Sequence, residues 1–312
     1  MQKKDKIYVA GHQGLVGSAI FCRLKKRGFT NLITKTRAEV DLLNQEHVRG
    51  FFEEYKPDFV FLAAGKVGGV YANNTYRAEF IYENLVIQTN LIHQSYLSEV
   101  KKLIFFGCSS MYPQITLQPM KEEFLLSGYL EPTNEPFAVA KLAGVKMCES
   151  YNRQYGTGFI SVIPTNLYGI NQNYDPMNSL VVPALIRKFH EARHSNAKEV
   201  VIWGSGRPSR DFLFAGDLAD AVIFLMEAYL GNDILNIGTG KDYTIGELAE
   251  IVKEVVNYEG KIIYDVSKPD GVLVKLQDVT KISQLGWKYK VDLKEGICQV
   301  YDEFKELNKP MV

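Results

Sequence analysis

The chain has 312 residues, 46% of them hydrophobic, which is enough to bury one large core and that of a smaller companion lobe. Its 36 basic residues balance 36 acidic ones, so no broad field favours nucleic acid or an anionic membrane as a partner. No apolar run approaches the ~20 residues that cross a bilayer, and we expect a cytoplasmic protein.

The first half of the chain alternates short β-rich runs with amphipathic segments. Strands are expected at residues 6–10, 31–36, 59–64, 102–107 and 159–164, and helices at 15–28, 80–98 and 138–155. After residue 164 the alternation is less regular, and Gly and Pro residues interrupt the segments. The alternation predicts an α/β fold built on a Rossmann-type, doubly wound parallel sheet.

A glycine-rich motif directly follows the first expected strand. It reads Gly11-His-Gln-Gly-Leu-Val-Gly17 and opens the first expected helix, where backbone amides can approach a pyrophosphate without obstruction by Cβ atoms. A merely tight strand-to-helix turn is the alternative interpretation. The placement of the motif favours a dinucleotide cofactor.

The residues about 20 positions beyond this motif carry positive charge, where an NAD-binding chain has an acid for the ribose hydroxyl. They read Lys35-Thr-Arg37, and a cation there favours NADP(H), with Arg37 at the 2′-phosphate. Asp41 and Leu42 would then flank the adenine. The alternative is a solvated basic turn, because Lys and Arg are common on surfaces.

A second pair of motifs, Phe105-Phe-Gly-Cys-Ser-Ser-Met-Tyr112 and Asn134-Glu-Pro-Phe-Ala-Val-Ala-Lys141, frames a reductase-like site. In short-chain dehydrogenases a Tyr and a Lys four residues later lie one helical turn apart, so that the ammonium lowers the pKa of the phenol. Lys141 is present, but Phe137 stands in the place of the tyrosine and has no proton to give.

Long motifs elsewhere carry a family resemblance. They are Lys66-Val-Gly-Gly69, Asn73-Asn-Thr-Tyr76, Leu130-Glu-Pro-Thr-Asn-Glu-Pro136, Cys148-Glu-Ser-Tyr-Asn-Arg-Gln-Tyr-Gly156, Pro164-Thr-Asn-Leu-Tyr-Gly169 and Pro183-Ala-Leu-Ile-Arg187. Nearly end to end, the chain resembles the GDP-L-fucose synthases, which are epimerase/reductases of the extended short-chain dehydrogenase family. The resemblance implies an NADPH-binding domain at residues 1–165, with a returning segment at about 210–240. It also implies a GDP-sugar-binding α/β lobe at residues 166–312 and hydride delivery to a C4 ketone.

The resemblance extends to individual ligand contacts. Cofactor contacts are expected at Gly11, Gln13, Gly14, Leu15, Val16, Arg37, Asp41, Leu42, Ala63, Ala64, Lys141, Pro164, Asn166 and Leu167. Substrate contacts are expected at Asn166, Arg187, Trp203, Arg210 and Lys275. A guanidinium suits a diphosphate because it can engage two oxygens at once, and surface arginines are the alternative. A homodimer through the helical faces at 87–97 and 143–155 is also implied, unless these faces belong to the intrachain core.

Besides Phe137, three positions that bear on the chemistry depart from the family pattern. The chain has Gly107-Cys-Ser-Ser110 in place of Gly-Ser-Ser-Cys, so Cys108 replaces the serine that helps to bind the keto oxygen and Ser110 replaces an epimerisation cysteine. Leu180 stands in the place of the epimerisation histidine. Proton movement beside a ketone needs an acid and a base with pKa values near the working pH, which Ser and Leu cannot supply. We therefore expect no epimerase activity.

Reduction at C4 is less affected, because the hydride comes from the cofactor and the protein mainly orients the substrate and supplies a proton. Lys141 is expected to protonate the alkoxide directly or through water, with Cys108, Ser109 or Ser110 donating hydrogen bonds. Tyr168 is a further candidate acid. Alternatively, Lys141 binds only the nicotinamide ribose. An engineered Tyr→Phe change at Phe137 is a third possibility, although three neighbouring departures make natural divergence more economical.

The sequence thus predicts an NADPH-dependent C4 reductase of a GDP-linked 4-keto sugar, of the heptose or 6-deoxymannose type, in capsular or other surface-glycan synthesis. A bifunctional epimerase/reductase and a catalytically silent nucleotide-sugar-binding subunit remain as alternatives. We expect no metal site, because the four cysteines are widely spaced and lack a neighbouring histidine cluster. All four are expected to be buried structural thiols: Cys22, Cys108, Cys148 and Cys298.

Overall fold

Six parallel strands form the larger sheet of the computed structural model, which describes residues 1–175, 179–268 and 270–308. From one edge to the other they are β2 (Leu32–Ile33), β1 (Ile7–Ala10), β3 (Phe59–Leu62), β4 (Lys102–Phe106), β5 (Phe159–Pro164) and β9 (Leu235–Ile237). The chain order reverses between β1 and β3. Ligands of open α/β sheets bind beyond the carboxyl ends of the strands at such a switch point.

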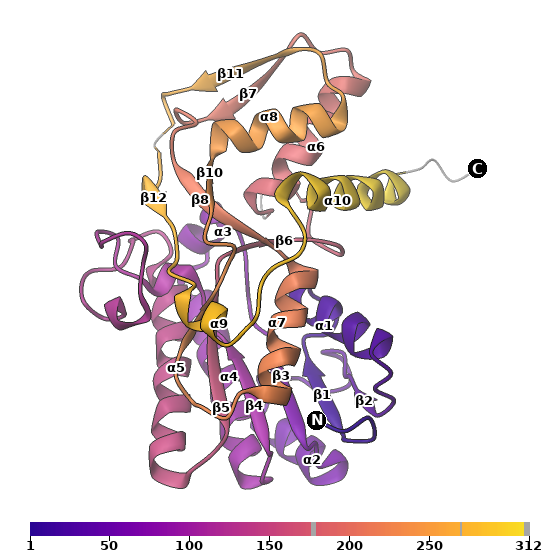
Figure 1. Cartoon of the computed structure of the whole chain (residues 1–312), viewed down its shortest axis with the longest axis vertical. Coiled ribbons are helices and arrows are strands. Elements are labelled where there is room, and N and C mark those ends of the chain that lie inside the picture. Colours follow the sequence, from indigo (N-terminus) through magenta and orange to yellow (C-terminus); the bar gives the residue numbers. More distant parts are fainter. Residues whose placement is uncertain (176–178, 269, 309–312) are drawn as a thin grey trace.

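Helices cover both faces of this sheet (Figure 1). One face is packed against α1 (Leu15–Lys26) and α7 (Ala215–Ala228), and the other against α2 (Gln45–Tyr55), α4 (Arg77–Leu97) and α5 (Glu135–Tyr155). Because strands covered on both sides have no solvent face, they read as continuous apolar runs. The run in β3 is Phe-Val-Phe-Leu, and all four residues are buried.

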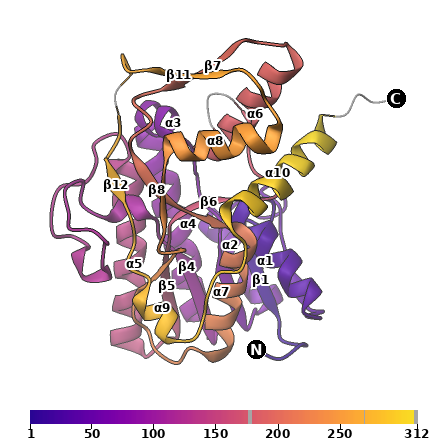
Figure 2. The same cartoon turned by 45° about the horizontal axis from the view of Figure 1, so that its top comes forward.

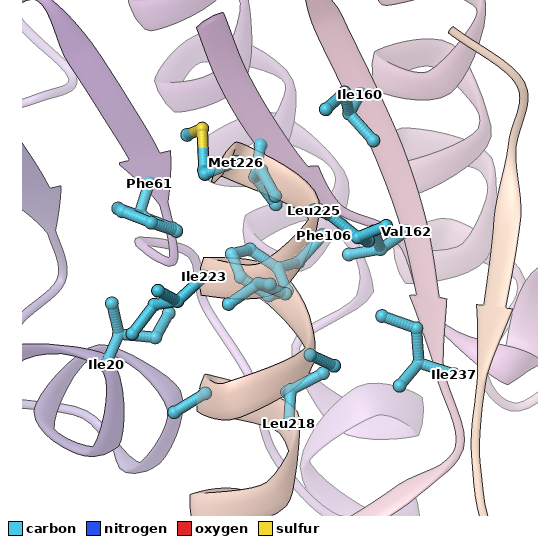
Figure 3. Close-up of a cluster of buried hydrophobic side chains, with 14 of the residues drawn as sticks. Ile20, Phe61, Phe106, Ile160, Val162, Leu218, Ile223, Leu225, Met226 and Ile237 are labelled. Carbon is cyan, nitrogen blue, oxygen red and sulfur yellow. The ribbon is translucent and has the colours of Figure 1, made fainter. Parts of the chain in front are cut away.

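Alternation along the strands divides the core into two layers. Phe61 joins the cluster beneath α1 and α7, whereas the neighbouring Val60 and Leu62 join the cluster beneath α2, α4 and α5. Figure 3 shows the first cluster, in which Phe61 and Phe106 meet side chains of α7. Each such burial contributes about 1.5–3 kcal/mol, so these layers fix the sheet on which the site is built.

A smaller lobe follows β5. It contains β6 (Asn166–Tyr168), α6 (Val181–His194), β7 (Glu199–Trp203), β8 (Ser209–Phe214), β10 (Asp242–Thr244), α8 (Ile245–Val256), β11 (Lys261–Asp265), β12 (Val274–Lys275) and α10 (Leu293–Leu307). Strand β8 pairs with β6, β10 and β12, and β7 pairs with β11. A capping box between Thr244 and Glu247 fixes the start of α8. Figure 2 shows this lobe beside the ends of the sheet strands.

Short elements connect the two parts. They are α3 (Val70–Thr75), the 3-10 turns η1 (Ser109–Met111) and η2 (Glu122–Phe124), and α9 (Thr280–Gln284). The segment after β12, residues 276–279, is called the strap here. Its Leu276 carbonyl accepts a backbone hydrogen bond of 2.7 Å from the Met120 N–H. The side chain of Gln277 donates to the carbonyl of Ile163 in β5. The strap therefore ties the smaller lobe to the sheet beside the reductase-like motifs.

The predicted fold class is confirmed, and all five expected strands are present. The second expected strand is shorter than residues 31–36. Helix α5 begins earlier than expected, at Glu135, because Pro136 suits the first turn of a helix. The domain boundary at residues 165 and 166 stays a prediction. Within the expected returning segment 210–240, α7 and β9 join the larger sheet layers, whereas β8 belongs to the smaller sheet.

The four cysteines are free thiols with different environments. Cys148 is buried and Cys108 is half-buried, whereas Cys22 on α1 and Cys298 on α10 are exposed. The expectation of buried thiols is therefore wrong for Cys22 and Cys298, because each lies on the solvent face of an amphipathic helix. No helix in the described part of the chain has the length and apolar character to span a membrane.

Candidate active site

A cavity of about 490 Å³ lies at the switch point between β1 and β3. Many of the expected cofactor contacts line it, namely Gly11, Gln13, Gly14, Arg37, Asp41, Leu42, Ala63 and Ala64. They come from three separate segments, which follow β1, β2 and β3 in the chain. The fold thus gathers these residues at the sheet edge where a nucleotide is expected.

The glycine motif forms one wall of this cavity. Gly11 has a φ of +79°, which favours glycine, and a Cβ on Gly17 would lie 2.2 Å from the carbonyl oxygen of Gly11. Gly14 is the N-cap of α1, and no side chain caps this helix end. Free amides at a helix N-terminus attract anions. The motif therefore fits a pyrophosphate.

The basic turn, Lys35 to Arg37, also contributes to the lining of this cavity. The Lys35 ammonium is 3.7 Å from Glu39 and 4.6 Å from the centre of the Tyr55 ring. Arg37 Nε is 3.8 Å from Asp41 Oδ1, and the Arg37 side chain is 72% exposed. Since an exposed ion pair is weak, Arg37 is available to a phosphate at the mouth of the cavity.

The remaining expected cofactor contacts do not line the cavity; they are Leu15, Val16, Lys141, Pro164, Asn166 and Leu167. Val16 and Leu167 pack against the core cluster of Figure 3. The amide nitrogen of Asn166 donates to the carbonyl of Asp211 at 3.1 Å. Val16, Leu167 and Asn166 are thus engaged in packing or backbone contacts, and cofactor contacts by all six residues stay predictions.

Lys141 lies on α5 with only 6% of its surface exposed. Its ammonium is 5.0 Å from the centre of the Phe105 ring and 5.9 Å from that of Phe137. Within the described residues, no carboxylate pairs with it. Burial lowers the pKa of Lys141 to about 8, although the nearby Cys108 acts to raise it. The ammonium can therefore release a proton near neutral pH.

The altered triplet lies beside this lysine. Ser109 and Ser110 form the first turn of η1, which packs against α5. Burial raises the pKa of the Cys108 thiol, and the ammonium groups of Lys141 and Lys275 oppose that effect. The thiol is therefore neutral near pH 7 and can donate a hydrogen bond. The structure brings together Lys141 and the Cys108 to Ser110 segment.

The Phe137 ring is half-buried and meets the Phe80 ring edge-on, with ring centres 6.2 Å apart. Tyr168 does not replace the missing phenol. Its side chain is fully buried in the core of the smaller lobe, and its hydroxyl faces the carbonyl of Leu293 at 3.5 Å. Burial also raises the pKa of Tyr168. The prediction of Tyr168 as a candidate acid is therefore wrong.

Two of the expected substrate contacts lie side by side, because Lys275 of β12 is in register with Arg210 of β8. Arg210 donates to the carbonyls of Ser209 and Val272, at 2.6 and 2.7 Å. Burial lowers the pKa of Lys275, and the charge of Arg210 lowers it further. In the described chain neither cation has a carboxylate in an ion pair. Two adjacent cations without such a partner can attract an anion.

The other expected substrate contacts are farther out in the smaller lobe. Arg187 of α6 pairs with Glu191 at 2.6 Å and donates to the carbonyl of Tyr174 at 3.1 Å. Trp203 ends β7 with 70% of its surface exposed, and the Lys268 ammonium lies 5.5 Å from its ring centre. An exposed indole at a strand end can stack on a planar base.

Sequence reasoning missed part of the cavity wall. Lys66 lines the cavity and forms ion pairs with Glu79 and Glu83. Asn84 fixes this segment, since its side chain accepts from the Lys66 N–H at 3.1 Å and donates to the Lys66 carbonyl at 3.0 Å. A Cβ on Gly65 would lie 2.7 Å from Asn84 Oδ1 and 3.6 Å from Lys141 Nζ. The position of Gly65 and Lys66 just after β3 was the available signal, whereas Asn84 lies on α4.

Comparison with known proteins bears on this site. The model of the NAD dependent epimerase/dehydratase family matches residues 7–238. GDP-L-fucose synthase from Escherichia coli (strain K12) is 50% identical over 312 residues, covering 97% of each chain. The chain belongs to the NAD dependent epimerase/dehydratase family. Its resemblance to the GDP-L-fucose synthases, and with it the prediction of a short-chain oxidoreductase, is confirmed.

Two solved structures resemble this family member closely. A GDP-6-OMe-4-keto-L-xylo-heptose reductase from C. jejuni is 44% identical, with a TM-score of 0.94 and 99% of each chain covered. A GDP-mannoheptose C4 reductase from Campylobacter jejuni, solved with NADP bound, is 46% identical, with a TM-score of 0.91 and 98% and 99% coverage. Both of these similar proteins are reductases of GDP-linked heptoses.

Proposed function

We propose that this epimerase/dehydratase family member reduces the C4 ketone of a GDP-linked sugar with NADPH and does not epimerise C3 or C5. The observation that carries the proposal is Lys141, a buried ammonium that lies beside Cys108 and has no carboxylate partner among the described residues. A group of this kind can supply the proton that Phe137 cannot.

The residues fit the cofactor. The Gly11 to Gly17 loop brings free amides to the cavity, and Arg37 offers a cation where a 2′-phosphate would lie. When bound, NADPH supplies the hydride for the reduction. Lys66 and Asn84 hold the loop that follows β3, and so shape the wall of the cavity. The NADP-bound C4 reductase supports this choice of cofactor.

The protein's part in the reduction is to polarise the ketone and deliver a proton. The Cys108 thiol and the Ser109 and Ser110 hydroxyls donate hydrogen bonds to the keto oxygen, which stabilise the developing negative charge. The Lys141 ammonium then transfers a proton to that oxygen, directly or through water. Its pKa of about 8 keeps it protonated at neutral pH and makes it a far better acid than an exposed lysine.

The same site lacks the groups that epimerisation needs. Ser110 occupies the position of the expected cysteine, and Leu180 precedes α6 where a histidine is expected. Neither side chain titrates near neutral pH, so neither can remove a proton from a carbon beside the ketone. These residues support a dedicated reductase over a bifunctional enzyme.

The adjacent cations Arg210 and Lys275 are proposed to hold the diphosphate of GDP, with Arg187 and Trp203 farther along the nucleotide. A homodimer is proposed through the faces of α4 and α5 at residues 87–97 and 143–155, where Leu97 and Tyr155 are 55% and 46% exposed. The product would serve capsular or other surface-glycan synthesis.

The test measures the rate of NADPH oxidation, from the fall in NADPH absorbance. The two substrates are GDP-4-keto-6-deoxymannose and a GDP-4-keto-heptose. The proposal expects steady turnover of at least one of them. Binding of NADPH and GDP without turnover of either would instead favour a catalytically silent subunit. The Phe137→Tyr variant separates a disarmed enzyme, which regains activity, from a binding protein, which does not.

A further inference from the structure

Asn236 joins two segments that both lead to residues of the candidate active site. It belongs to β9 and is fully buried. Its Oδ1 atom accepts a hydrogen bond of 2.7 Å from the Tyr112 hydroxyl and one of 2.9 Å from Gln277 Nε2. Tyr112 ends the turn η1, whereas Gln277 belongs to the strap, which Figure 1 shows running from β12 to α9. One oxygen atom thus links the altered triplet to the strap.

An amide group suits the position of Asn236 because its neighbours are of two kinds. Besides the two donors at Oδ1, the carbonyls of Met120 and Asp278 accept from Asn236 Nδ2 at 2.9 and 3.1 Å. A carboxylate would face these carbonyl oxygens without a proton to share, and an apolar side chain would leave Tyr112 and Gln277 without this acceptor. Buried groups that lose a partner are costly. The amide of Asn236 matches all of these partners.

Tyr112 holds the turn that carries the altered triplet. It is the C-cap of η1, and its backbone N–H donates to the Ser109 carbonyl at 3.4 Å. The side chain is only 2% exposed and packs in the core beneath α2, α4 and α5. The bond from its hydroxyl to Asn236 therefore fixes one end of the turn that presents Cys108, Ser109 and Ser110.

The strap holds the residue that precedes it, Lys275, against the larger part of the molecule. The N–H of Leu276 donates to Gln118 Oε1 at 2.9 Å, and the carbonyl of Leu276 accepts from the Met120 N–H. The next residue is Gln277, which reaches Asn236. Lys275 is thus followed at once by two anchored residues, so its position depends on the strap.

Packing alone does not account for a glutamine in the strap. Gln277 is 1% exposed, and its Nε2 atom donates to the Ile163 carbonyl at 3.1 Å as well as to Asn236. Its Oε1 atom is buried and has no hydrogen-bond partner among the described residues. A methionine has a similar length and would avoid the cost of this unpaired oxygen. The glutamine adds the two donated bonds, which orient the strap.

The two linked segments bring Lys275 and Cys108 within electrostatic reach of each other. Burial raises the pKa of the Cys108 thiol, and Lys275 is one of the groups that oppose this effect. Burial lowers the pKa of Lys275, and the thiol acts in the opposite direction. Lys275 comes from the smaller lobe and Cys108 follows β4 of the larger sheet. A GDP-sugar that engages both needs their separation to match the distance from its diphosphate to its C4 carbonyl.

We propose that Tyr112, Asn236 and Gln277 are positioning residues, which together set the separation between Lys275 and the Cys108 to Ser110 segment. This inference rests on the proposed function and adds to it three buried residues that act through others. Gln277 keeps Lys275 in place for the diphosphate. Tyr112 keeps the hydrogen-bond donors of the triplet in place for the keto oxygen, and Asn236 couples the two.

The experiment measures the affinity for GDP, the KM for a GDP-4-keto sugar and the rate of hydride transfer in a single turnover at saturating sugar. Gln277→Met should weaken GDP binding and raise KM about three- to tenfold, as the loss of one hydrogen bond allows, with the hydride-transfer rate nearly unchanged. Tyr112→Phe should slow hydride transfer by a similar factor and leave the affinity for GDP unchanged. Both changes preserve the size of the side chain.

The double variant tests the coupling through Asn236. Since both bonds end on the same oxygen, Tyr112→Phe with Gln277→Met leaves that buried acceptor without either donor. The loss in kcat/KM should therefore exceed the product of the two single losses. A loss equal to that product would overturn the role of Asn236 as the shared link.

Tyr258→Phe is the matched control. Tyr258 is buried in the core of the smaller lobe, and its hydroxyl donates to the Ala197 carbonyl at 2.8 Å. This variant loses the same kind of bond outside the network, so it should leave GDP affinity, KM and hydride transfer unchanged. Equal effects in Tyr258→Phe would reduce the network to general stabilisation and overturn its positioning role.

The remaining outcomes separate this inference from the proposed function. Normal turnover by the wild-type protein, with unchanged values in Gln277→Met and in Tyr112→Phe, would overturn the positioning role and leave the reductase intact. Absence of turnover by the wild-type protein would overturn the proposed function. The GDP affinity of Gln277→Met would then still decide whether the strap positions Lys275, since that measurement needs no reaction.

Discussion

The Lys141 ammonium lies 5.9 Å from the centre of the Phe137 ring, one turn farther along α5. At this spacing a phenol would have its pKa lowered by the ammonium, but phenylalanine offers no proton. The cation itself is buried, and Cys108 is close enough to act on the pKa of Lys141. The site has thus kept the lysine and lost the tyrosine, and the reactivity of Lys141 becomes the central question.

Substitution of Lys141 by Met should slow hydride transfer in a single turnover by about 10²–10⁴-fold, since this is the usual contribution of a positioned general acid. The measurement is stopped-flow NADPH oxidation with enzyme in excess over the GDP-4-keto sugar. Lys146→Met, farther along the same helix and paired with Glu149 on the surface, is the control and should react normally. An unchanged rate in Lys141→Met would remove the lysine from the proposed chemistry.

The rate should depend on pH through the same group. The reaction uses the protonated form of Lys141, whose pKa is lowered by burial to about 8. We therefore expect kcat to be level at neutral pH and to fall as the pH rises above about 8. A pH profile of kcat with saturating substrate measures this. The fall should be absent from the residual activity of Lys141→Met, and its persistence there would point to another acid.

The buried ammonium should also cost stability. The pKa of Lys141 is about 8 in the folded protein and 10.5 as an ordinary lysine, so the unfolded chain binds more protons between these values. Stability therefore rises with pH across this window, and the full cost is present below pH 8. Because one pKa unit corresponds to about 1.4 kcal/mol, Lys141→Met should raise the free energy of unfolding at pH 7 by up to about 3 kcal/mol. Urea denaturation of both proteins at pH 7 checks this, and a loss of stability would contradict it.

Reversal of the charge at Arg37 should change the choice of cofactor. Arg37 lies at the cavity mouth, exposed and weakly paired with Asp41. We expect Arg37→Asp to weaken NADPH binding by about 10–100-fold, as one charge-assisted contact allows, and to leave NADH binding nearly unchanged. Fluorescence titration with each cofactor measures the two affinities. Arg49→Asp, on the exposed face of α2, is the control. Equal losses for both cofactors would refute the assignment of Arg37 to the 2′-phosphate.

Much of the fold could be predicted because local patterns and packing agree. The apolar runs of β3, β4 and β5 are buried on both faces, and such runs leave few alternatives. The glycine loop could be placed because it joins the first strand to the first helix. The short strands of the smaller lobe, such as β6 and β12, could not, since two or three residues carry too little periodicity.

The site was predicted less completely for a related reason. Residues such as Lys66 and Asn84 act through contacts with segments distant in sequence, which no local pattern reveals. Tyr168 was a reasonable acid by residue type, but its strand turns it into the core of the smaller lobe. The departures at Cys108, Ser110 and Phe137 could be read directly, because a resemblance fixes where the usual residues belong.

The most direct test of a reductase without epimerase activity is the reaction carried out in D₂O with unlabelled NADPH, followed by NMR of the purified GDP-sugar product. Our account predicts turnover with no deuterium on any carbon, since Ser110 and Leu180 cannot exchange protons beside the ketone. Deuterium at C3 or C5, above the level of an enzyme-free control, would contradict it and would mean that other residues of this site carry out epimerisation.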